Sequence, residues 1–137
     1  MIETTFAIIK PDAVAAKNSG KIIDLIEKNN FDILGMQKLK LSTAQAEKFY
    51  EIHNQRSWFR ELIDFMTSGP VVVMALAKPN AVIEWRNLMG STNPAEAAQG
   101  TIRKLFGSNI GENATHGSDS VETSKIEIAQ FFPELVK

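Results

Sequence analysis

The sequence contains no cysteine among its 137 residues, which excludes disulfide bonds, thiolate metal ligands and cysteine nucleophiles. It also lacks a strong charge of either sign, because 15 lysines and arginines nearly balance 16 aspartates and glutamates. The formal net charge of −1 creates no overall field that would attract nucleic acid or an anionic membrane. Any binding site for anions must therefore depend on a local cluster of cations.

Long apolar runs and targeting signals are missing as well. No apolar run approaches the ~18 residues that a membrane-spanning helix needs, and the N-terminus shows no basic segment followed by an apolar one. We therefore expect no signal peptide and a cytoplasmic protein. The length, with 44% hydrophobic and 23% charged residues, indicates one domain over residues 1–137 with its own core.

Apolar patterns predict alternating strands and helices. Strands are expected at residues 5–9, 31–41 and 71–77, with a short one before His116, and helices begin near residues 19, 42, 58, 80 and 120. This order is a split β-α-β pattern, so we expect an α+β fold of the ferredoxin-like type, with an antiparallel four-stranded sheet covered by helices. Neither G-x-x-x-x-G-K-[ST] nor G-x-G-x-x-G occurs, so any nucleotide must bind without these common phosphate loops.

Several helix starts carry local signals. Pro11 fits the first turn of a helix, Ser42 with Gln45 forms a capping box, and Asn80 is expected to cap the helix that ends at Gly90.

Two helical stripes complete the secondary-structure prediction. After Ser42, a stripe of Ala46, Phe49, Tyr50 and His53 should turn Tyr50 and His53 in the same direction, toward a pocket edge, whereas core packing suits Phe49. The last helix should bury a stripe of Val121, Ile128, Ala129 and Phe132 and end at Pro133.

His116 is one of two histidines and stands in the octapeptide 113–120, between a short strand and a helix entry. Gly117 directly after it would allow a sharp turn with positive φ, so the imidazole should project from a strand end into a cleft. A side chain that titrates near neutral pH and carries a nucleophilic ring nitrogen suits that position. From this segment alone, a surface histidine in a polar turn is an equal alternative.

A polar segment over residues 91–100 is too long for a plain connection, and such loops are usually functional or disordered. Arg86, Thr92 and Arg103 in and around it supply two cations and a hydroxyl, with no carboxylate expected close by. This mixture suits an anion, most plausibly phosphate, although scattered surface arginines are the commoner occurrence. Lys10 stands at the exit of the first strand, the usual place for a functional side chain, although a solvent-facing lysine is the commoner outcome for an isolated Lys-Pro pair.

Taken together, these motifs resemble the nucleoside diphosphate kinase family, and the resemblance covers essentially the whole chain. The active-site signature is Asn113-Ala114-Thr115-His116-Gly117-Ser118-Asp119-Ser120. The supporting motifs, in order, are Ile9-Lys10-Pro11-Asp12-Ala13-Val14, Phe49-Tyr50 with His53 and Arg56, Ser68-Gly69-Pro70-Val71-Val72, Arg86 with Met89-Gly90 and Thr92-Asn93-Pro94, and Gly100-Thr101-Ile102-Arg103.

The resemblance implies transfer of the γ-phosphate from a nucleoside triphosphate to a nucleoside diphosphate, in a ping-pong mechanism through a phosphohistidine at His116, with broad base tolerance. It implies Mg²⁺ bound through the nucleotide phosphates and a homo-oligomer, a tetramer or hexamer built from dimers. A regulatory or nucleic-acid-binding module on the same fold is the alternative. The filled positions His116, Lys10 and Arg103 argue against a degenerate enzyme, and the absence of a basic stripe argues against nucleic acid as the primary partner.

The resemblance also assigns roles to individual residues. Glu127 would hold the nonreacting nitrogen of His116, with Ser118 assisting and Tyr50 beside the ring. The phosphate binders would be His53, Arg86, Thr92 and Arg103, together with Lys10. The sugar hydroxyls would be bound by Asn113 and also by Lys10. The base would be held by Phe59, Leu62 and Ile110. Departures from the family pattern occur outside these positions, at Ser57, Trp58, Gln99 and Lys104-Leu105.

Overall fold

A computed structural model describes residues 2–136, so the two end residues of the expected domain lie outside the described part. Its four strands are β1 (Ile2–Ile9), β2 (Asp32–Leu39), β3 (Val71–Pro79) and β4 (Thr115–Gly117). They form one sheet in the order β2-β3-β1-β4, and every neighbouring pair is antiparallel. The ferredoxin-like α+β fold expected from the sequence is confirmed.

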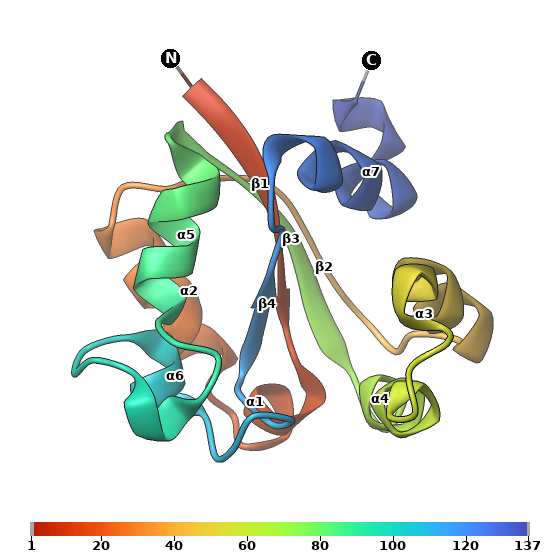
Figure 1. Cartoon of the computed structure of the whole chain (residues 1–137). Helices are drawn as coiled ribbons and strands as arrows, with labels where there is room; N and C mark the ends of the chain where they lie inside the picture. Colours follow the sequence, from red (N-terminus) through yellow and green to blue (C-terminus); the bar gives the residue numbers. More distant parts are fainter. Residues whose placement is uncertain (1, 137) are drawn as a thin grey trace.

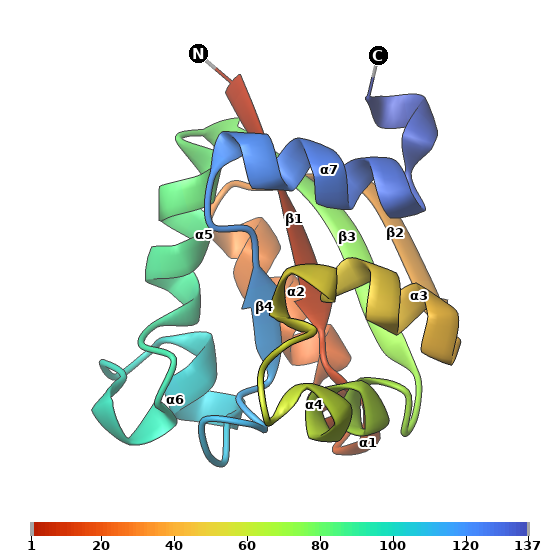
Figure 2. The same cartoon turned by 45° about the vertical axis from the view of Figure 1, so that its right-hand side comes forward.

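Helices cover both faces of this sheet (Figure 1). They are α1 (Pro11–Ala15), α2 (Ser19–Lys28), α3 (Thr43–Phe49), α4 (Phe59–Met66), α5 (Ala81–Met89), α6 (Ile102–Phe106) and α7 (Val121–Phe131), with short 3₁₀ turns at Glu51–His53, Pro94–Glu96 and Pro133–Leu135. Both views place α2, α5 and α6 on one side of the sheet and α3, α4 and α7 on the other (Figures 1 and 2). No helix within residues 2–136 has the length and apolar character of a membrane-crossing segment.

The sheet separates two apolar cores, because successive side chains of a strand point to opposite faces. In the central strands β1 and β3, Ile9 and Met74 pack toward α2 and α5, whereas Ile8 and Val73 pack toward α3, α4 and α7. The uninterrupted apolar run of β3 is therefore explained, since both of its faces are covered. The run predicted at 71–77 forms a central strand, as expected.

Local signals located most helix starts correctly. Pro11 occupies the first turn of α1, and the Ser42 and Gln45 capping box is formed in full. The expected cap at Asn80 is wrong in its chemistry, because Asn80 has φ of 57° and its side chain caps nothing. The carboxylate of Glu3, at the start of β1, instead accepts the Val82 N–H at 2.9 Å. A contact between distant segments replaces the local one.

Two helical stripes were predicted correctly only in part: Ile128 and Phe132 are buried as expected, and Tyr50 and His53 face one cavity, but other features differ. The helix α3 ends at Phe49, so Tyr50 is its C-cap and His53 lies in a separate 3₁₀ turn. In α7 the buried positions are Ser124, Ile128 and Phe131, while Val121 and Ala129 are exposed and Phe132 is buried just after the helix. The exposed positions arise because α7 rests on β1 through a narrow face.

The role expected for Gly117 is wrong as well. The residue with positive φ near His116 is Ala114, at 75°, and Gly117 is outside that region. Gly117 is instead constrained by packing, since a Cβ there would lie 2.5 Å from Met89 Cε and 2.6 Å from Trp85 Cδ1. The residue after His116 must be glycine because α5 packs directly against the backbone of β4.

We expect Gly117→Ala to lower the free energy of unfolding by about 1–3 kcal/mol, because the added methyl group pushes the side chains of Trp85 and Met89 away from β4. Gly20→Ala is the matched control: Gly20 lies in α2 with no atom within 4 Å of the added Cβ. That change should raise stability by about 0.5–1 kcal/mol through helix propensity. Urea unfolding of the variants measures both effects, and equal stability of Gly117→Ala and wild type would contradict the packing argument.

Candidate functional site

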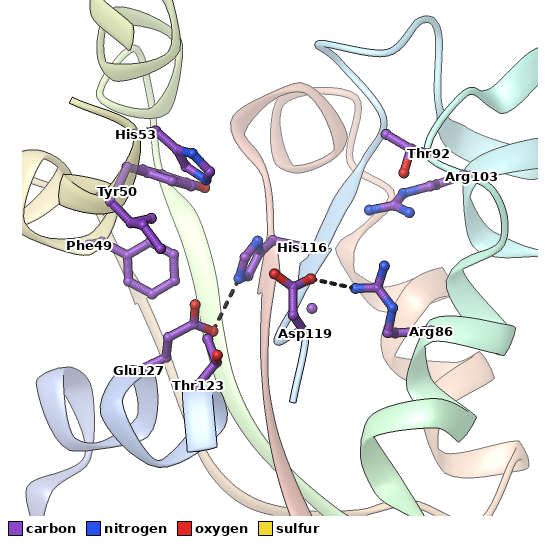
Figure 3. Close-up of a pocket in the computed structure, with 12 residues that line it drawn as sticks. Phe49, Tyr50, His53, Arg86, Thr92, Arg103, His116, Asp119, Thr123 and Glu127 are labelled. Atoms are coloured by element: carbon purple, nitrogen blue, oxygen red, sulfur yellow. Dashed lines mark hydrogen bonds and ion pairs between the residues drawn. The ribbon is translucent and has the colours of Figure 1, made fainter. Parts of the chain in front are cut away.

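A cavity of about 290 Å³ opens where β4 meets elements from both helical layers. Seven of the residues predicted from the sequence line it: Tyr50, His53, Arg86, Thr92, Arg103, His116 and Glu127. Figure 3 shows the imidazole of His116 between an aromatic wall at the C-terminal end of α3 and a cationic wall from α5 and α6. Residues from widely separated parts of the sequence therefore face one space.

His116 is held by a carboxylate from α7. Its Nε2 lies 3.2 Å from Oε1 of Glu127, and the hydroxyl of Ser118 donates to the same oxygen at 2.7 Å. The His116 and Glu127 side chains are 20% and 12% exposed, so the interaction is shielded from solvent without being sealed from it. Ser118 does not line the cavity, but it fixes the carboxylate from behind.

This arrangement selects one form of the imidazole. A carboxylate can only accept, so Nε2 carries the hydrogen and the other ring nitrogen, Nδ1, keeps its lone pair. In Figure 3 that second nitrogen points away from Glu127. The site can therefore present a neutral histidine as a nucleophile, with an anion ready to stabilise the ring when it becomes charged.

The local structure around α7 explains how Glu127 reaches His116. Ser120 caps the helix by accepting the Thr123 N–H at 3.1 Å. The chain therefore turns into α7 only four residues after His116, and the helix returns over β1 to bring Glu127 back to the ring. The expected helix entry in the octapeptide is confirmed.

The aromatic wall consists of Phe49 and Tyr50, whose ring centroids lie 5.2 and 6.1 Å from that of His116 in edge-on arrangements. The Tyr50 hydroxyl is buried and has no hydrogen-bond partner within residues 2–136. Burial, and secondly the charge of Glu127, raises the pKa of Tyr50. Tyr50 therefore keeps its proton and remains a donor without a partner beside the cavity.

Arg103 joins the cationic wall to the backbone of β4. Its Nη1 and Nη2 donate to the carbonyls of Gly90 and Thr115, each at 3.0 Å. Burial, and secondly the charge of Arg86, lowers the pKa of Arg103 to about 10. Folding thus brings two guanidinium groups together at a cost that an anion would relieve.

The expectation that no carboxylate lies near these cations is wrong. Asp119 lies 3.1 Å from Arg86, and the two side chains are 83% and 44% exposed. An ion pair this open to solvent contributes little stability. An anion in the cavity can therefore compete for Arg86.

A buried chain of hydrogen bonds supports the cationic wall from behind. Lys10 Nζ donates to Oδ1 of Asn113 at 2.9 Å, and Asn113 Nδ2 donates to the carbonyl of Thr92 at 3.0 Å. Neither Lys10 nor Asn113 lines the cavity. Burial, followed by repulsion from Arg103, lowers the pKa of Lys10 to about 8, although Asp12 acts in the opposite direction.

Phe59, Leu62 and Ile110 are not brought into this cavity. Phe59 and Leu62 are half-buried in α4 against the core beneath it, while Ile110 lies in the loop before β4 and is 60% exposed. The base-binding role assigned to these residues stays a prediction.

Five residues that line the cavity were not assigned to the site from the sequence: Phe49, Ile52, Gly117, Asp119 and Thr123. Three of them carried a usable signal, since Gly117 and Asp119 lie in the His116 octapeptide and Thr123 precedes Glu127 by four helical positions. Phe49 was assigned to the core, yet it also contacts His116. Nothing in the sequence marks Ile52, which is 85% exposed.

No group of three or more His, Asp or Glu side chains within residues 2–136 could hold a metal ion. Of the two carboxylates at the cavity, Glu127 is engaged by His116 and Ser118, and Asp119 by Arg86. A divalent cation would thus need most of its ligands from a bound molecule.

Comparison with known proteins adds independent findings. The family model described as "Nucleoside diphosphate kinase" matches residues 3–136. Proteins of that name from Phenylobacterium zucineum and Trichlorobacter lovleyi are 55% and 57% identical over 134 and 131 residues. These matches cover 98% and 96% of this chain, and 96% and 95% of the relatives. The structure of the Aquifex aeolicus nucleoside diphosphate kinase superposes with a TM-score of 0.96 at 38% identity, covering 98% of both chains.

The buried Lys10 makes the free energy of unfolding depend on pH. Its folded pKa of about 8 lies below the ordinary value of 10.5, so the unfolded chain binds more protons between these values and stability rises with pH there. Below pH 8 the penalty for the buried charge is fully present. We expect wild type to gain stability relative to Lys10→Met between pH 8 and 10.5, measured by urea unfolding.

The same substitution at the exposed Lys21 controls for the loss of one charge. A stability difference between wild type and Lys10→Met that stays constant across this range would show that the Lys10 ammonium is not destabilised by folding.

Proposed function

The chain belongs to the nucleoside diphosphate kinase family and transfers a phosphoryl group from a nucleoside triphosphate to a nucleoside diphosphate, and we propose that it does so through a phosphorylated His116. The observation that carries this proposal is the hydrogen bond between His116 Nε2 and Glu127. It leaves Nδ1 as the free nucleophilic atom in a cavity with a cationic wall.

The proposed reaction has two displacements at phosphorus. In the first, the lone pair of His116 Nδ1 attacks the γ-phosphorus, the bond to the β–γ bridging oxygen breaks, and the nucleoside diphosphate leaves with that oxygen. In the second, a terminal β-phosphate oxygen of another diphosphate attacks the same phosphorus and the nitrogen–phosphorus bond breaks. The ring becomes cationic after the first step, so the Glu127 carboxylate stabilises the intermediate.

Positioning and charge supply the rest of the catalysis, because the phosphoryl group carries its charge on peripheral oxygens during transfer. We propose that Arg86, Arg103, His53 and Thr92 bind those oxygens. The support is their shared cavity with His116 and the lowered pKa of Arg103, which an incoming anion would restore. The unpartnered hydroxyl of Tyr50 offers a further donor beside the ring.

We propose that Mg²⁺ enters as part of the substrate. The ion prefers about six oxygen ligands in octahedral geometry, and both carboxylates at the cavity already have partners. Phosphate oxygens and water would therefore complete its coordination. When bound with the nucleotide, the cation would neutralise part of the phosphate charge.

Nucleoside recognition would lie beside the cavity, at residues that do not line it. We propose that Lys10 and Asn113 bind the sugar hydroxyls and that Phe59, Leu62 and Ile110 hold the base. The exposed Ile110 and the half-buried Phe59 offer apolar contact without hydrogen-bonding groups, and such contact cannot read the edge of a base. Broad base tolerance would follow.

The homo-oligomer expected from the family resemblance also belongs to this proposal. The strand β2 is an edge of the sheet and exposes Leu34 and Met36, which are 48% and 49% exposed. An edge strand with apolar side chains is suited to association with another chain. A second copy at this edge would give the dimer from which a tetramer or hexamer is built, and a cytoplasmic location remains the expectation.

We expect incubation with ATP and Mg²⁺, without an acceptor, to leave one phosphate on His116. The label should be lost in acid and survive mild alkali, because protonation of a phosphoimidazole improves its leaving group. It should also pass to any added nucleoside diphosphate. Mass spectrometry of the labelled chain, with release measured as a function of pH, tests this directly.

His116→Ala should abolish both labelling and transfer, whereas Ser118→Ala should keep most of the labelling because Glu127 still holds the ring. Serine phosphate would show the opposite lability. Acid-stable label, or transfer that persists in His116→Ala, would refute the proposed intermediate.

We expect shallow base preference, with kcat/KM for purine and pyrimidine diphosphates differing by less than about 1000-fold. A larger ratio would require ~4 kcal/mol of base discrimination, which apolar contacts at Phe59 and Ile110 do not supply. Steady-state kinetics with several diphosphate acceptors measures the ratio. A preference above this limit would mean that another group reads the base.

A further inference from the structure

The strand that carries His116 is only three residues long and has one neighbour. Its pairs with β1 are Thr115 with Ile9, His116 with Ile8 and Gly117 with Ala7. In the described sheet, β4 is an edge strand. With so few ladder contacts, the position of His116 must depend on how each end of β4 is fixed.

The upstream end is fixed by an unusual turn. Thr115 N–H donates to the carbonyl of Asn113 at 2.9 Å, and the residue between them, Ala114, has φ of 75°. This is a γ-turn of the rare, strained kind. An alanine persists in that conformation only where its surroundings enforce it.

Those surroundings come from residues directly after β1. The Lys10 N–H donates to the carbonyl of Ala114 at 2.8 Å, and Oδ2 of Asp12 accepts the Ala114 N–H at 3.1 Å. Both backbone polar groups of Ala114 are thus engaged. Ala114 is fully buried, so its N–H would otherwise have no water to bond.

We propose that Asp12 is a positioning residue for His116, acting through the γ-turn at Ala114. Asp12 touches none of the cavity, so its effect on the reaction would be indirect. Without an acceptor in this position, Ala114 relaxes toward negative φ to satisfy its N–H, and the turn into β4 changes. The imidazole then moves relative to Glu127 and the cationic wall. This inference rests on the proposed role of His116.

The negative charge of Asp12 also acts on Lys10, independently of the hydrogen bond to Ala114. Its carboxylate lies near Lys10 and opposes the lowering of the lysine pKa by burial. The other carboxylate oxygen, Oδ1, is buried and has no hydrogen-bond partner within residues 2–136. Replacing that oxygen with an amide nitrogen therefore removes the charge but breaks none of the hydrogen bonds described.

Two substitutions separate the acceptor from the charge. Asp12→Asn keeps an oxygen in place and removes the charge, whereas Asp12→Glu keeps the charge and displaces the oxygen by one methylene. We expect kcat of Asp12→Asn to stay within about 3-fold of wild type and that of Asp12→Glu to fall by about 10- to 100-fold. The KM for nucleotide should change little in either variant, because Asp12 does not line the cavity.

Ala114→Gly supplies the rescue. Glycine occupies positive φ without strain, so the turn no longer needs to be enforced, and Asp12→Glu/Ala114→Gly should recover most of the lost kcat. The rate of single-turnover phosphorylation of His116 should follow the same ranking as kcat. It is measured in wild type, Asp12→Asn, Asp12→Glu, Ala114→Gly and the double variant. Melting temperatures show whether the variants are folded during these measurements.

Three results would overturn the inference: an equal loss in Asp12→Asn and Asp12→Glu, a loss confined to KM, or no recovery with Ala114→Gly. Failure of wild type itself to carry phosphate on His116 is a different outcome. It would refute the proposed nucleophile and, with it, the reason for positioning it.

Discussion

The short ladder between β1 and β4 is the constraint on which the site depends. Adjacent residues of a strand face opposite sides, so a slip of one residue would turn His116 away from Glu127 and toward α5. Gly117 already occupies that side, against Trp85 and Met89. Because β4 is the last strand of the sheet, side chains from both helical layers can meet around its free edge. The aromatic wall comes from one layer and the guanidinium groups from the other.

Much of the fold was predictable from local patterns. Buried β3, the capping box at Ser42 and the entry to α7 each follow from a few consecutive residues, and their order along the chain determined the split β-α-β topology. Motif order likewise identified the residues that the structure gathers around His116. Local sequence is informative wherever the partners of a residue lie within one helix turn or one strand.

The sequence was misleading where distant segments supply the partner. Glu3 caps α5 in place of Asn80, and α5 rather than a turn requires glycine at position 117. Asp119 pairs with Arg86 across 33 residues of sequence. The strained residue near His116 is Ala114, an ordinary alanine in the sequence, because its conformation is imposed by residues about a hundred positions away.

The crowding of cations beside the cavity has a consequence for the folding equilibrium. Burial lowers the pKa values of Lys10 and Arg103, with added repulsion from Arg103 on Lys10 and from Arg86 on Arg103. The empty protein therefore holds free energy that an anionic ligand releases. A ligand that binds only the native state adds stability by RT ln(1 + [L]/Kd). Bound nucleotide would therefore stabilise the native state relative to the unfolded chain. The free energy of unfolding would then rise and fall with the concentration of nucleotide.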